Sequence, residues 1–147
     1  MKEYRIICGV MLIACAVLVA GCITTPAVPP EDLVRAQVGA FCAGLVAADL
    51  DVMMASFAEE FEHYEWGDKE GAKEFLEEAV DMGYLEDMEI ASEDMEIELD
   101  DDATSATAYP VDIEGAFGSA TLEFTLGREE VEGKCVWLIT GMDVSGV

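Results

Sequence analysis

The spacing of apolar residues changes at Gly83, and this change limits the possible folds more than any other feature of the chain. Before Gly83, apolar residues recur every three or four positions, as they do on one face of a helix. After Gly83 they alternate with polar residues, which is typical of strands that pack on a core with one face. Helices followed by antiparallel strands predict the α+β fold class.

The pattern also predicts where the individual elements lie. Helices are expected at residues 31–47, 51–60 and 69–82, with a short strand-like segment at 61–66. Strands are expected at residues 88–99, 104–113, 122–126 and 135–140, with turns at 100–102 and 115–118 and a charged hairpin loop at 127–133. Pro110 has no N–H to give to a neighbouring strand, so it predicts a sheet edge or a bulge.

The chain is strongly acidic, with a formal net charge of −25. From residue 22 onward it has five basic residues against 31 acidic ones. Such a surface repels the phosphates of nucleic acids and the head groups of anionic lipids, and it disfavours an anionic substrate. Solubility, adaptation to a salty medium, or a partner that recognises the acidic surface would each account for the charge.

The N-terminus carries a targeting signal. No charged residue occurs from Ile6 to Pro30, and the part from Ile6 to Ala20 is strongly apolar and ends in small residues. This is the form of the hydrophobic region of a secretory signal peptide. The run is also nearly long enough to span a bilayer, so an uncleaved anchor stays open as an alternative.

The segment Leu18-Val19-Ala20-Gly21-Cys22 resembles the lipobox of bacterial lipoproteins. The resemblance implies that a diacylglyceryl group is attached to the Cys22 sulfur and that the chain is cleaved before this residue. Two or three acyl chains of the palmitate type give a stable membrane anchor. We therefore expect a signal peptide at 1–21, a proline-rich lipidated tether at 22–30 and a domain at 31–147. The domain would lie outside the cytoplasm, on the cell membrane or the outer membrane.

The domain resembles the nuclear transport factor 2-like superfamily, also called the cystatin-like cone. The resemblance is carried by Ala48-Asp49-Leu50-Asp51, Phe57-Ala58-Glu59-Glu60-Phe61, Gly71 before Phe75, and the final stretch from Gly133 to Ile139. It implies three N-terminal helices packed in a strongly curved antiparallel sheet. Members of the superfamily include isomerases, dehydratases, cyclases and binding modules, so the fold alone does not give an activity.

Two residues are candidates for catalysis. The steroid isomerases of the superfamily place a general base on the strand after the second helix, and Glu65 matches that position best. His63 lies two residues earlier, so a continuous strand would put both side chains on one face. A carboxylate in an apolar cone would have a raised pKa and could abstract a proton.

Six apolar residues are expected to point into the cone. They either line a ligand pocket beside His63 and Glu65 or fill the cone as a core. They are Phe41, Leu45, Phe61, Phe75, Phe124 and Trp137.

Cys42 and Cys135 are the two cysteines of the domain. In an exported protein they could form a disulfide, although two cysteines are also commonly a pair of small buried side chains. No cysteine spacing typical of a metal site occurs, and Asp100-Asp101-Asp102 lacks the ligand spacing of a calcium loop, so no metal or cofactor is expected.

Two functions follow from these features. The first is a membrane-anchored lipoprotein whose domain binds a small apolar ligand or a protein partner without catalysis. The alternative is an enzyme of the isomerase, dehydratase or cyclase type that uses Glu65. Val136 and Leu138 alternate with Cys135 and Trp137, so both faces of the last strand are apolar. The outer face therefore predicts a homodimer, and no nucleic acid is expected as a partner.

Overall fold

The computed structural model describes residues 27–146. The predicted signal peptide and the lipid site Cys22 lie outside the described residues. The helices are α1 (Pro30–Ala47), α2 (Leu50–Ala55) and α3 (Lys69–Asp81). The strands are β1 (Phe57–His63), β2 (Gly67–Asp68), β3 (Glu89–Ala91), β4 (Glu96–Leu99), β5 (Ser105–Gly115), β6 (Gly118–Val131) and β7 (Lys134–Ser145).

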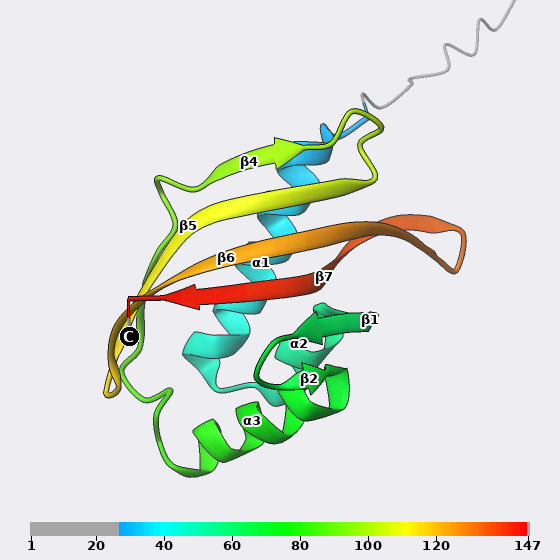
Figure 1. The fold of residues 1–147 in the computed structure, drawn as a ribbon. Coiled ribbons are helices and arrows are strands. Elements are labelled where there is room, and N and C mark those ends of the chain that lie inside the picture. The colour runs from blue at the N-terminus through cyan, green and yellow to red at the C-terminus, as the bar shows by residue number, and fades with distance from the viewer. Residues whose placement is uncertain (1–26, 147) are drawn as a thin grey trace, which may run out of the picture.

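The strands form one curved sheet that does not close into a barrel (Figure 1). Its order is β2-β1-β7-β6-β5-β3, and β4 also pairs with β5. The pairing of β1 with β7 is parallel, and the other pairings are antiparallel. The α+β class and the curved sheet agree with the sequence prediction. Within residues 27–146, no helix is long and apolar enough to cross a membrane.

Capping aspartates mark where α2 and α3 begin. The side chain of Asp49 accepts a hydrogen bond from the N–H of Val52, and this cap starts α2. Asp68 caps α3 by accepting from the N–H groups of Glu70 and Gly71. The helix predicted at 51–60 ends earlier than expected, because the chain enters β1 at Phe57 and buries that ring.

The core lies between the helices and the concave face of the sheet. Phe41 of α1 makes edge-to-face contacts with Phe57 of β1 and Phe124 of β6, at centroid distances of 5.4 and 5.5 Å. Phe61 packs against Phe57 at 4.5 Å. Burying large rings in this way is among the strongest contributions to the stability of a small domain.

Two details of the sheet differ from or extend the sequence prediction. The charged loop expected at 127–133 is mostly strand, because β6 continues to Val131 and only Glu132 and Gly133 form the turn. Both turn residues have positive φ, 50° and 75°, as two-residue hairpin turns require. At Pro110 the register between β5 and β6 shifts, so the predicted bulge is confirmed.

Candidate functional site

Glu65 and His63 do not share a strand face. β1 ends at His63, and Glu65 lies exposed in the turn that leads to β2. His63 is buried, with 6% of its surface exposed. The prediction of a common face is wrong because it assumed that the strand continued through residue 66. The chain turns immediately after His63 instead, and this points Glu65 into solvent.

His63 organises this turn. Its Nδ1 accepts hydrogen bonds from the N–H groups of Glu65 and Trp66, at 3.1 and 3.2 Å. Nδ1 can accept only when it carries no proton, so the ring is neutral and its proton lies on Nε2. Burial lowers the pKa of His63, while the carboxylates of Glu65 and Asp143 act in the opposite direction. Nε2 is buried and has no hydrogen-bond partner among the described residues.

His63 is one of four aromatic rings that form a column. The imidazole stacks on Trp66 at a centroid distance of 3.9 Å, and Trp66 stacks on Phe75 of α3 at 4.4 Å. Tyr64 lies against His63 at 4.6 Å. We call these four residues the aromatic column. The turn between β1 and β2 lies beside α3 (Figure 1), and the contact between Trp66 and Phe75 joins these two segments.

The sequence contains an indication of this column, which the expectation that Phe75 points into the cone did not take into account. Residues 61–66 are unusually rich in aromatic side chains. The buried face of α3 is formed by Ala72, Leu76 and Ala79, and Phe75 lies about 100° from Leu76 around the helix. Phe75 is therefore 44% exposed and does not point into the cone. Its predicted place in a pocket is wrong.

The other predicted pocket residues fill the core. They are Phe41, Leu45, Phe61, Phe124 and Trp137, and each is at least 95% buried. They pack against one another and line none of the three best-formed pockets of the described chain. Of the two alternatives that the sequence left open, the structure matches the filled cone.

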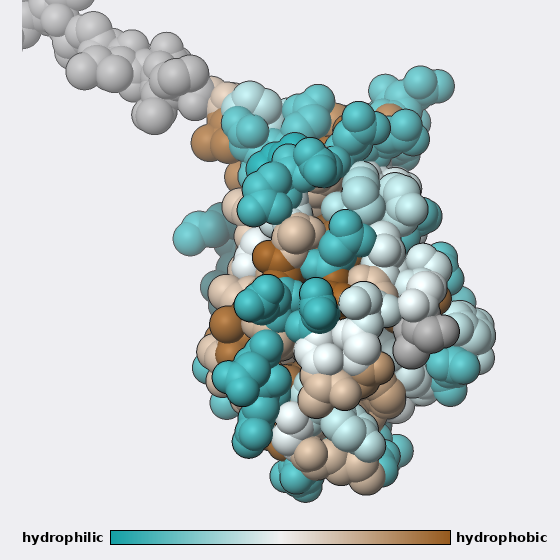
Figure 2. Space-filling model, turned by 90° about the vertical axis from the view of Figure 1, so that its left-hand side faces the viewer, coloured by the Kyte–Doolittle hydropathy of each residue, from teal (hydrophilic) through white to brown (hydrophobic). Residues whose placement is uncertain are grey.

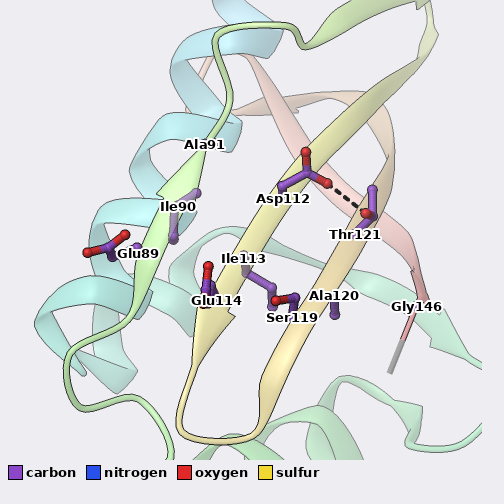
Figure 3. Close-up of a pocket in the computed structure, with 10 residues that line it drawn as sticks. All are labelled: Glu89, Ile90, Ala91, Asp112, Ile113, Glu114, Ser119, Ala120, Thr121 and Gly146. Carbon is purple, nitrogen blue, oxygen red and sulfur yellow. Dashed lines mark hydrogen bonds between the residues drawn. The ribbon is translucent and has the colours of Figure 1, made fainter.

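The pockets lie on the surface. One is a groove of about 370 Å³ lined by β3, β5 and β6, and Figure 3 shows its side chains. Glu89 faces Glu114 across the strand pair, while the Thr121 hydroxyl donates a 2.6 Å hydrogen bond to Asp112. Figure 2 shows one side of the molecule covered mainly by hydrophilic residues, with small hydrophobic areas between them. This groove has carboxylates and hydroxyls but no basic side chain.

The disulfide between Cys42 and Cys135, which the sequence left open, is not formed. Cys42 is buried in α1, and Cys135 is exposed on β7, where the Arg128 guanidinium donates to its sulfur at 3.3 Å. Burial raises the pKa of the Cys42 thiol to about 11, so that thiol is unreactive near neutral pH. Spacing in the sequence left the pairing open because it cannot tell which side of an element a cysteine occupies. Within residues 27–146, no three side chains that ligate metals gather into a site.

Comparison with known proteins supports the fold. No protein-family model matches the chain, and no curated protein sequence matches it significantly. Among solved structures, a protein of unknown function with a cystatin-like fold from Nostoc punctiforme is 16% identical, with a TM-score of 0.59 over 78% of this chain and 88% of that chain. A nuclear transport factor 2-like protein of unknown function from Pseudomonas putida is 13% identical, with a TM-score of 0.61 over 78% of this chain and 84% of that chain.

A third similar structure is a ketosteroid isomerase-like protein from Erwinia carotovora atroseptica. It is 15% identical, with a TM-score of 0.55 over 78% of this chain and 93% of that chain. At these identities the likeness establishes the cystatin-like, nuclear transport factor 2-like fold alone.

Proposed function

We propose that this chain is an exported lipoprotein, attached to a membrane through Cys22, and that its domain binds a protein partner without catalysis. The observation that carries the non-catalytic assignment is the filled cone. Phe41, Phe61 and Phe124 occupy the space in which a substrate would bind. Glu65 lies in solvent instead of facing that space.

A general base must reach the proton that it abstracts, at about 3 Å, in a site that holds the substrate. Glu65 meets neither condition, and a partner fits this architecture better than a small apolar ligand, because a partner needs a surface and not a cavity. The exposed acidic residues and the aromatic column offer such a surface.

The tether limits where the domain works. Helix α1 begins at Pro30, eight residues after Cys22. A fully extended chain of that length spans about 28 Å, so an anchored domain would stay within roughly its own diameter of the membrane. The partner is therefore expected at the same membrane, outside the cytoplasm.

Lipidation is tested by metabolic labelling of a bacterial expression host with an alkyne-tagged fatty acid. The wild-type chain should be labelled, whereas Cys22→Ser should not. Cys42→Ser and Cys135→Ser are matched controls that remove other thiols and should keep the label. Equal labelling of Cys22→Ser and the wild type would contradict the anchor.

The enzymatic alternative is favoured by one observation, the likeness to a ketosteroid isomerase-like structure. It is tested by offering the full chain, solubilised in nonionic detergent, a β,γ-unsaturated ketosteroid and following the absorbance of the conjugated product. We expect no conversion above the rate in buffer. Conversion by the wild type that Glu65→Gln abolishes would replace the binding function with isomerase chemistry.

A further inference from the structure

The two ends of the aromatic column are open to solvent. Within the column, the His63 ring contacts two other rings, those of Tyr64 and Trp66. Both faces of Trp66 are used, by His63 and Phe75. The terminal rings remain, and Tyr64 is 72% exposed while Phe75 is 44% exposed. Each terminal ring therefore has a surface that the fold itself does not cover.

Contacts within the domain hold the turn and the helix that carry the column. His63 fixes the turn through the two hydrogen bonds to its Nδ1. Gly71 brings the first turn of α3 directly against the carbonyl oxygen of Trp66, and this contact ties α3 to the turn. A binding surface whose side chains are already held loses little conformational entropy on association.

The charge around the column is negative. Glu65 lies in the same turn, and Glu74 and Glu78 lie beside Phe75 on α3; all three are exposed. None of them takes part in an ion pair among the described residues.

The nearby lysines are already paired. Lys69 bonds Glu59 at 2.6 Å, and Lys73 lies within 4.0 Å of both Glu70 and Glu77. The free carboxylates beside the column are therefore not neutralised by the domain itself.

We propose that the aromatic column binds an arginine-bearing segment of a protein partner. Aromatic faces attract cations through the ring quadrupole, and unpaired carboxylates beside them attract the same cations. The guanidinium group of arginine suits both, because its plane stacks on a ring while its N–H groups bond carboxylates. The large net negative charge also steers a basic segment towards the domain and repels an acidic one.

This inference deepens the proposed partner-binding function and does not depend on lipidation of Cys22. Its test uses the full chain in nonionic detergent and three capped peptides, in which glycine alternates with arginine, with lysine or with leucine. Affinities are measured by calorimetry at 0.15 M salt. We expect the arginine peptide to bind about three-fold more tightly than the lysine peptide, and the leucine peptide not to bind.

Substitutions locate the site. Phe75→Leu and Tyr64→Leu should remove the preference for arginine over lysine, while Glu65→Gln with Glu78→Gln should weaken both peptides. Tyr109→Leu is the matched control, since Tyr109 is 46% exposed on β5 at a distance in sequence from the column, and it should leave the preference unchanged. Circular dichroism checks that each variant is folded.

Three results would overturn the proposal. Equal affinity for the arginine and lysine peptides would show attraction by charge alone. Binding of the leucine peptide would show an apolar docking surface. Dimers of the wild type that Phe75→Leu dissociates in sedimentation would show that a second copy covers the column. None of these results affects the lipid-labelling test of Cys22.

Discussion

Gly71 in the first turn of α3 lies so close to the carbonyl oxygen of Trp66 that a Cβ atom at this position would overlap it. Gly71→Ala should therefore force the turn and the helix apart and lower the free energy of unfolding by about 2–3 kcal/mol. Urea unfolding followed by far-UV circular dichroism measures this change.

Gly39 provides the control for this substitution, because it lies exposed in α1 and a Cβ there would meet nothing within 4 Å. Gly39→Ala should raise the free energy of unfolding by about 0.5–1 kcal/mol, the usual helix preference of alanine over glycine. Similar losses in both variants would mean that the contact between Gly71 and Trp66 is not tight in solution.

The contribution of His63 to the stability of the domain should fall between neutral and mildly acidic pH. The pKa of His63 is lowered in the folded state, from an ordinary value near 6.5, mainly by burial. The contribution of the neutral ring is fully present above about pH 6.5 and is lost as the pH falls through the folded-state pKa. Protonation converts Nδ1 into a donor and breaks its bonds to Glu65 and Trp66.

His63 is the single histidine of the sequence, so the comparison is direct. Lowering the pH from 7.5 to 5.0 should lower the urea midpoint of the wild type relative to that of His63→Gln, in which residue 63 cannot titrate. Equal pH dependence of the two proteins would show that the turn tolerates an imidazolium ion.

The N-cap of α3 should contribute about 1 kcal/mol to the free energy of unfolding. Asp68 accepts hydrogen bonds from two backbone N–H groups of the first turn, each at 3.1 Å. Asp68→Ala removes both acceptors and should lower the unfolding midpoint in urea accordingly. Asp81→Ala, at the last residue of the same helix, removes a carboxylate from the negative end of the helix dipole and should be neutral or slightly stabilising.

Self-association through the outer sheet face should depend on salt. Val136 and Leu138 are half-buried on β7, and Glu129 lies directly across the ladder from Val136. Burial and the neighbouring Glu60 carboxylate raise the pKa of Glu129, which shows that negative charge is already crowded on this face. Two copies would bring these carboxylates together, so dimers are expected in about 0.5 M salt and not in 0.02 M salt.

Sedimentation velocity on the full chain in nonionic detergent measures this association. Leu138→Glu should keep the chain monomeric at both salt concentrations. Leu33→Glu, which changes an exposed leucine on α1, should behave like the wild type. A wild-type monomer in high salt would remove this face as an interface between copies.

The buried faces of α1 and β6 were predictable from the periodicity of the sequence. Val34, Val38 and Phe41 line the buried face of α1, and Leu122, Phe124 and Leu126 alternate into the core from β6, as their spacing indicated. These positions were predictable because burial on one face imposes a period of 3.6 or 2 on the residues.

The candidate site was less predictable because tertiary contacts decide it. The place where β1 stops depends on His63 accepting hydrogen bonds from the backbone N–H groups of Glu65 and Trp66, and a strand pattern continues through residue 66 without showing this. Phe75 is only partly exposed because Trp66 stacks on one face of the Phe75 ring. Neither contact produces a periodic pattern of residues in the sequence.

The position of β7 between β1 and β6 has a consequence for how the chain is made. β1 ends at residue 63, yet it pairs in parallel with residues 139–141. Among the strands of residues 27–146, the two-residue β2 is the one partner of β1 that is synthesised before them. Pairings between segments so distant in sequence form slowly, because a long loop must close first. The edge of the sheet formed by β1 and β2 is therefore joined to the rest of the sheet only after β7 has emerged from the ribosome.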